Sequence, residues 1–289
     1  MVFIEVILHD VVITSSCNLI PMKTMLAQVR SACNFFLNSP KREALLIAII
    51  TKGVIDTSRR KPLLDLCCTR WAERHDGYRH FYQAYVFIVK ALELIGYGMH
   101  CEEFETFATG WNNKAKSDAI SLLGSICNFE FIVSFLTAYQ FLSHLSGITV
   151  KLQSGTAGIM DAFLSIEEIM SVYVELRTNA NTHFNKIFLQ AKRMGEAVQV
   201  EPSKCRVSGY QKHRPNDPTE TVEDHYPVNV AVPCLDHISV QLDQRFSSLS
   251  NTATSLLGLI PSIIIDREPD LQAAIELYSR DLPSPELIP

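Results

Sequence analysis

One stripe of apolar side chains constrains the fold of this chain more than any other feature. Between Ile159 and Met194, apolar residues recur at steps of three and four, which places them on one face of a helix of about ten turns. Such a helix either spans the core of a helical bundle or forms the seam of a coiled-coil dimer. We favour the bundle because Ile169, Val172 and Phe188 widen the stripe beyond the narrow seam of a coiled coil.

Most of the remaining chain carries the same helical signature. Apolar residues follow helical spacing over 21–38, and Ser39 followed by Pro40 is typical of a helix start, here of a helix that runs to Gly53. A third helix is predicted from about Thr69 to Leu94 or Ile95, closed by the glycines at 96 and 98. The further predicted helices are 115–127, 129–148, 235–249 and 270–280.

A proline-rich stretch interrupts this pattern. Five prolines fall between Pro202 and Pro233, among polar and charged residues. Proline removes a backbone donor and disfavours regular structure, so we predict a long irregular loop over 199–234.

Composition and cysteine spacing exclude several classes of protein. The 289 residues are 47% hydrophobic and 20% charged, which is ordinary for a folded protein. The eight cysteines are scattered and include no C-x2-C pair, so we expect reduced thiols and no metal site. Cys67 and His75 would lie about 12 Å apart along one helix, too far for a thiol–imidazole pair. We therefore expect no catalytic thiol, and neither metal nor cofactor.

The range 131–150 has the length of a membrane span and contains no Asp, Glu, Lys or Arg. Polar residues dilute its hydropathy, however, and no positive cluster flanks it to set an orientation. We expect a buried helix here rather than a membrane segment.

The basic residues gather in the first third of the chain. Residues 1–100 carry 12 Lys and Arg against 8 Asp and Glu, whereas residues 101–289 carry 14 against 23. Six basic side chains within 21 positions form a candidate phosphate-binding face: Arg59, Arg60, Lys61, Arg70, Arg74 and Arg79. The other interpretation, which we favour, is that Trp71 packs in the core while the arginines pair with Asp65, Glu73 and Asp76.

Ordered sequence blocks resemble the hAT-type transposase-derived proteins, in particular the branch related to zinc-finger MYM-type proteins and the repressor of the inhibitor of the protein kinase. The blocks lie at 39–42, 66–76, 205–216, 232–247 and 278–285. The residues that carry the resemblance are Cys68, Thr69, Arg70, Trp71, Arg74, Gln211, Arg214, Asp236, His237, Arg245 and Phe246.

The resemblance implies an RNase H-like catalytic fold that is interrupted by a large helical insertion and followed by a dimerisation block. In such proteins three carboxylates hold two Mg²⁺ ions for phosphoryl transfer. Two of these acids precede the block at 39–42 and the third follows the insertion, so we expect all three to fall outside this chain. The expected organisation is an unmatched segment at 1–13, helices flanking an RNase H-like remnant at 14–98, and the helical insertion region at 99–289.

Two functions follow as expectations. The first is a catalytically inactive fragment that acts as a protein-interaction or dimerisation module, with itself or a related hAT-type protein as partner. The alternative is a remnant that binds DNA without sequence specificity through the Arg59–Arg79 face. No small-molecule substrate is expected, and the resemblance implies a nuclear location, with the cytoplasm otherwise.

Overall fold

The computed structural model describes residues 19–53, 71–98, 110–153, 159–204 and 221–257, of which 71–75, 146–153, 159–164 and 245–257 are described by their backbone alone. The mainly α-helical prediction is confirmed, since every regular element in these ranges is a helix. In chain order they are α2 (Ile20–Leu37), α3 (Pro40–Gly53), α4 (Trp71–Tyr97), α6 (Asn113–Ile126), α7 (Phe129–Gln153), α8 (Ile159–Thr178), α9 (Ala180–Glu196), α10 (Val222–Tyr226), the π-helix η2 (Pro227–Ala231) and α11 (Val232–Leu257).

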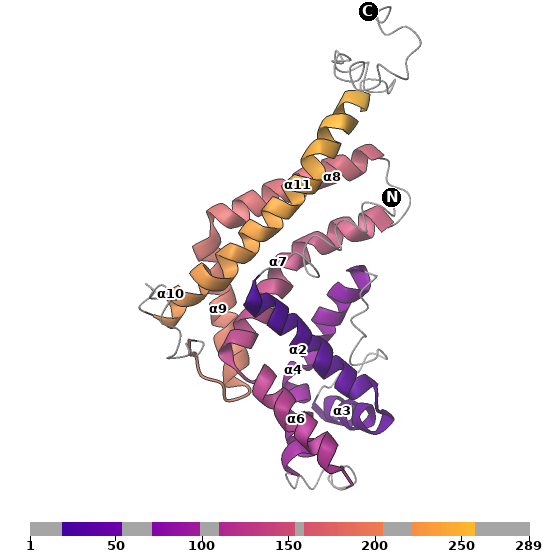
Figure 1. Ribbon diagram of the computed structural model, residues 1–289, viewed down its shortest axis with the longest axis vertical. Helices are drawn as coiled ribbons and strands as arrows, with labels where there is room; N and C mark the ends of the chain where they lie inside the picture. The colour runs from indigo at the N-terminus through magenta and orange to yellow at the C-terminus, as the bar shows by residue number, and fades with distance from the viewer. Residues whose placement is uncertain (1–18, 54–70, 99–109, 154–158, 205–220, 258–289) are drawn as a thin grey trace, which may run out of the picture.

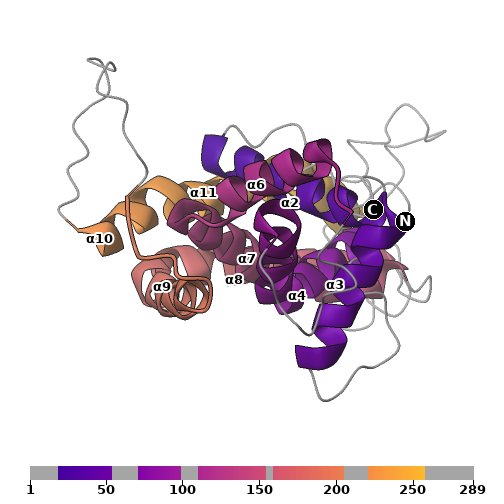
Figure 2. The ribbon, with the colours of Figure 1, turned by 90° about the horizontal axis from the view of Figure 1, so that it is seen from below.

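Helix α7 is the centre of the molecule. It packs against α2, α4 and α9, and Figure 2 shows α9 and α10 at one side of the group formed by α2, α4, α6 and α7. A helix that is apolar on all sides is typical of a buried position, and the run from Phe131 to Leu136 is buried throughout. We call α2, α3, α4, α6, α7 and α9 the body.

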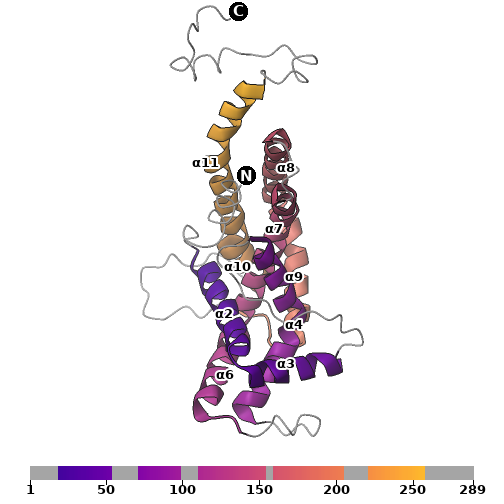
Figure 3. The same ribbon diagram turned by 90° about the vertical axis from the view of Figure 1, so that its right-hand side faces the viewer.

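Helices α8 and α11 pack against each other and project together from the body, as Figures 1 and 3 show. We call this pair the arm. Its buried side chains are mostly aliphatic and include one ring, Tyr173, whose hydroxyl donates a hydrogen bond of 2.7 Å to the carbonyl of Phe141 in α7. This hydrogen bond ties the arm to the body.

The single ten-turn helix predicted from the apolar stripe is wrong. The chain bends at Asn179, which has φ −101° and ψ 26°, between α8 and α9. From Ile166 onward, where its side chains are described, the stripe is buried except for the half-buried Met170; α8 packs mainly against α11, and α9 against α7. Asparagine has a low helix propensity, so the chain bends there and lets each half face a different partner.

The predicted loop over 199–234 is also wrong in its second half, because helix begins at Val222. The Thr221 side chain caps it by accepting the backbone N–H of Asp224 at 3.0 Å. Pro227 then begins a π turn, in which the N–H of Val232 bonds to the carbonyl of Pro227, five residues back. The wide turn lets the helical path continue through Pro227 and Pro233, which cannot donate a backbone hydrogen bond. Residues 205–220 and the predicted helix at 270–280 lie outside the described residues.

Candidate functional site

Only one side chain of the predicted basic face is described. Arg59, Arg60, Lys61 and Arg70 lie outside the described residues, and Arg74 is described by its backbone alone. A nitrogen of Arg79 lies 2.9 Å from the Asp76 carboxylate, with the two side chains 41% and 47% exposed. Pairing of the arginines with local acids is therefore confirmed at this one position.

The family-motif residues are described mainly at the start of α11. The Arg177 guanidinium of α8 donates to the Asp236 carboxylate through Nε, and its Nη2 lies 3.4 Å from the second oxygen. This hydrogen bond raises the pKa of Arg177 and links the two helices of the arm. His237 follows in α11 and is half-buried.

The side chains of the other motif residues are not described by the structure. Cys68, Thr69, Gln211 and Arg214 lie outside the described residues, whereas Trp71, Arg245 and Phe246 lie on helices that are described there by their backbone alone.

The sequence predicted neither a metal site nor a membrane-spanning helix. Across the described ranges, no three His, Cys, Asp or Glu side chains come together in a way that could hold a metal ion. No single described helix is long and apolar enough to cross a bilayer; only α6 with the first part of α7, bent by 70°, meets the length and composition together.

A groove lies between α4 and α9. Two of its lining residues belong to a chain of hydrogen bonds that links α7, α9 and α4: Gln140 donates to Gln190 at 2.6 Å, and Gln190 donates to the Tyr82 hydroxyl at 2.6 Å. The groove has a volume of about 560 Å³ and is lined by Tyr82, Tyr85, Val86, Lys186, Leu189, Gln190, Arg193 and Met194. We call it the α4/α9 groove.

The α4/α9 groove combines exposed apolar side chains with positive charge. Val86 is 41% exposed and Leu189 is 54% exposed, so both present apolar surface to solvent. Lys186 and Arg193 are its charged lining residues, and no acid lines it. Exposed aliphatic side chains beside cations are suited to a partner helix with an apolar stripe and acidic flanks.

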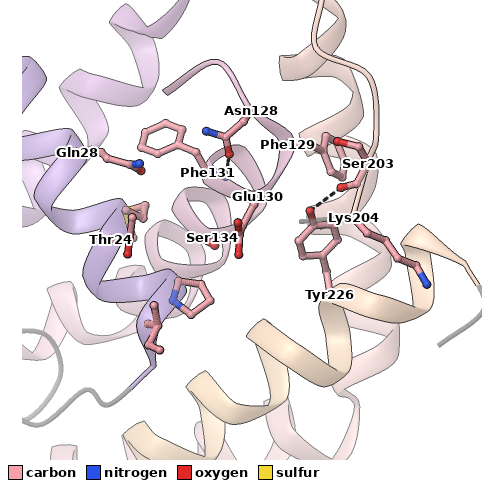
Figure 4. A pocket seen from close by; sticks show the side chains of 13 residues that line it. Thr24, Gln28, Asn128, Phe129, Glu130, Phe131, Ser134, Ser203, Lys204 and Tyr226 are labelled. Atoms are coloured by element: carbon pink, nitrogen blue, oxygen red, sulfur yellow. Dashed lines mark hydrogen bonds between the residues drawn. The ribbon is translucent and has the colours of Figure 1, made fainter. Parts of the chain in front are cut away.

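A second cavity, of about 540 Å³, opens at the start of α7 between α2 and α10 (Figure 4). The side chain of Asn128 caps α7 by accepting the N–H of Phe131 at 2.8 Å. The hydroxyl of Tyr226 donates to the carbonyl of Ser203 at 2.6 Å, which holds the chain after α9 against α10. We call this cavity the α7 cavity.

Four polar side chains border the α7 cavity without a partner. Thr24 and Gln28 come from α2, and Glu130 and Ser134 from α7; none of the four forms a side-chain hydrogen bond or ion pair within the described structure. Ser134 is 0% exposed at the cavity floor, and its Oγ is buried. An unpaired buried hydroxyl costs about 1–3 kcal/mol, so a ligand that offered a hydrogen bond there would recover part of that cost.

The sequence did not predict either cavity, although part of the signal was present. Leu189 lies outside the apolar stripe that runs through α9, so its exposure could have been read from helical spacing. The α7 cavity combines residues separated by up to about two hundred positions, and helical periodicity carries no information on such long-range pairing.

These features define the described chain as an all-helical bundle with a projecting helical arm. Comparison with known proteins finds distant similarity to the human "52 kDa repressor of the inhibitor of the protein kinase", 24% identical over 270 residues, covering 91% of this chain and 34% of that protein. The mouse protein of the same name is 24% identical over 283 residues, covering 96% of this chain and 36% of its own length. The chain thus spans about a third of the length of the curated relatives it matches. No family model and no solved structure matches.

Proposed function

We propose that this chain is a catalytically inactive, helical protein-interaction module of hAT-type transposase origin that acts in the nucleus. Distant similarity to a repressor over most of the chain, together with the ordered sequence blocks, supports this origin. The observation that carries the interaction role is the α4/α9 groove, because it presents Val86 and Leu189 to solvent in a lining that also holds two cations, Lys186 and Arg193.

The partner that fits the α4/α9 groove is an amphipathic helix with an acidic flank. Its apolar stripe would cover Val86 and Leu189, and its carboxylates would face Lys186 and Arg193. Each exposed ion pair adds little affinity, so burial of the apolar side chains supplies most of the binding free energy and the charges supply orientation.

A pair of model helices tests this proposal. A fluorescein-labelled peptide with leucines at helical spacing and glutamates on its flanks is titrated with the chain, beside a second peptide whose glutamates are replaced by lysines. We expect anisotropy to show at least about tenfold tighter binding of the acidic helix. Exchanging Lys186→Glu and Arg193→Glu together should reverse this preference.

Matched variants on other surfaces serve as controls. Leu189→Asp should weaken binding of the acidic helix, and Val240→Asp, at a similarly exposed valine of the arm, is its control. The double change Lys114→Glu and Lys116→Glu, at exposed positions of α6, is the control for the charge exchange in the groove. Equal binding of both peptides, or equal losses in the groove and control variants, would contradict the groove as the interaction site. Light scattering over a concentration series tests whether the partner is a second copy of the chain.

The inactive character is tested separately. A nuclease and strand-transfer assay with Mg²⁺ or Mn²⁺ should give no product with this chain. Reproducible activity that is lost on replacing an Asp or Glu would overturn this part of the proposal.

The second candidate function is DNA binding without sequence specificity through the Arg59–Arg79 face. The density of basic residues over 59–79 supports it, whereas the ion pair of Arg79 with Asp76 counts against it. Affinity for duplex DNA should then fall steeply with salt, and less steeply after Arg70→Ala and Arg74→Ala. Absence of binding at low salt would eliminate this candidate.

A further inference from the structure

We propose that the α7 cavity binds a guanidinium or alkylammonium group, with Glu130 as its counter-ion. This site is separate from the α4/α9 groove and does not depend on the function proposed for that groove. The ligand class follows from the charge, the hydrogen-bonding capacity and the apolar walls of the cavity.

The charge of the cavity selects a cation. Glu130 is half-buried in the first turn of α7 and forms no ion pair within the described residues. Lys204 is the second charged lining residue, but Figure 4 shows its amine directed away from Glu130. The start of a helix carries a partial positive charge, which here is reduced by the Asn128 cap and is smaller than the full charge of the carboxylate.

The polar groups around Glu130 match a group rich in N–H donors. Figure 4 shows Thr24 and Gln28 of α2 facing the same space as Glu130 and Ser134 of α7. Together they offer two hydroxyl oxygens, one amide oxygen and a carboxylate, all of which accept hydrogen bonds. A guanidinium supplies five N–H donors and an ammonium three, with no acceptor in either. The buried Ser134 Oγ gains a partner in this arrangement.

The remaining walls suit the alkyl stem of such a cation. Met25, Phe129 and Phe131 line the cavity and are nearly fully buried, with 1%, 1% and 2% exposure. Apolar stems of Lys and Arg side chains pack along surfaces of this kind while the charged head reaches polar groups. Two kinds of ligand share this chemistry: the arginine or lysine side chain of a peptide, and a free alkyl cation.

The test uses backbone amide spectra of the full ¹⁵N-labelled chain. It is titrated with n-propylguanidinium chloride and, as a neutral isostere, with n-propylurea. We expect saturable shifts at Thr24, Gln28, Glu130 and Ser134 with the cation, and at least about tenfold weaker binding of the urea. A second arm compares acetyl-Gly-Arg-Gly-amide with the peptide in which citrulline replaces arginine. Tighter binding of the arginine peptide than of propylguanidinium identifies a protein side chain as the source, and equal binding shows that the group alone is recognised.

Two variants and one matched control make the result decisive. Glu130→Gln should weaken binding of the cation about tenfold or more, whereas Glu43→Gln, which removes the first-turn acid of α3, should leave it unchanged. Ser134→Ala should weaken binding while raising the thermal midpoint, because it removes an unpaired buried hydroxyl; a purely structural role would raise the midpoint alone. Absence of saturable shifts at the cavity, or equal binding by wild type and Glu130→Gln, would overturn the proposal.

Discussion

The body and the arm bury their apolar side chains in different ways. In the body, rings of α4 and α7 pack together, with Phe81 and Phe135 centroids 5.2 Å apart and Tyr85 stacked on Phe131 at 6.2 Å. In the arm, α8 and α11 share one interface, in which Ile166 and Ile169 remain 3% and 9% exposed. A central helix with neighbours on several sides is stabilised by all of them, whereas the arm relies mainly on the interface of α8 with α11 and on a smaller contact of α8 with α7 and α9. Local unfolding of the arm should therefore cost less free energy than unfolding of the body.

Removal of a ring from the body is the largest expected effect. Phe81→Ala empties a fully buried position at the contact of α4 and α7 and should lower the free energy of unfolding by about 3–5 kcal/mol. Urea denaturation measures the change. A loss below about 1 kcal/mol would show that the aromatic cluster is not the main source of body stability.

In the arm, we expect a buried-residue substitution to lower the free energy of unfolding by less, and to affect only the arm. Ile238 of α11 is 1% exposed, and Ile238→Ala should cost about 2–3 kcal/mol because the site can relax toward solvent. Hydrogen exchange should then be faster in α8 and α11, while α4 and α7 keep their protection. Equal loss of protection in both regions would show that arm and body unfold as one unit.

The body should also weaken at alkaline pH through the half-buried thiol of Cys127. Burial, and secondarily the charge of Glu93, raises the pKa of Cys127 to about 11 from an ordinary value of 9.0. Because the folded pKa is the higher one, this stabilisation is complete below pH 9 and is lost as pH rises toward 11. Denaturation of wild type and Cys127→Ala across this range should show a steeper fall for wild type. Parallel curves would contradict ionisation of Cys127 as the cause.

The smallest expected effect is at the Arg177–Asp236 pair of the arm. Both side chains are about half exposed, so Arg177→Ala should cost less than about 1 kcal/mol, and the loss should shrink further in salt. Thermal denaturation at low and high ionic strength measures it. A larger loss that persists in salt would mean that this pair, rather than the apolar interface, holds the arm together.

Helical spacing predicted the elements of both regions well but not their partners. The start of α3 at Pro40 and the extents of α2 and α6 follow from local signals that the structure confirms. The bend at Asn179 could not be predicted in this way, because the apolar stripe continues through it. The two halves of the stripe differ only in their packing partner, which is α11 for the first half and α7 for the second.

The helix through Pro227 shows a second limit of local signals. Prolines predict a loop, yet a cap at Thr221 and a π turn keep the chain helical. Local signals predict the candidate sites even less well than the helices. Glu130 and Ser134 form a candidate site only together with Thr24 and Gln28, which lie about a hundred residues away in the sequence. Of the residues chosen from sequence, Arg79 and Asp236 both pair with opposite charges on the described surface.

The π turn over Pro227–Ala231 also has a consequence for how this chain tolerates changes in length. A π turn accommodates one more residue than the α-helical path that it replaces. Deletion of one residue there would restore regular α-helical winding and leave the orientation of the helix that follows essentially unchanged. A deletion of His237, inside the regular α-helix α11, has no extra residue to remove and would rotate Ile238 and Leu242, now buried, by about 100° away from their present contacts. The π turn is therefore the place where this helical path can lose one residue, whereas the same deletion inside α11 would disrupt the packing of α11 on α8.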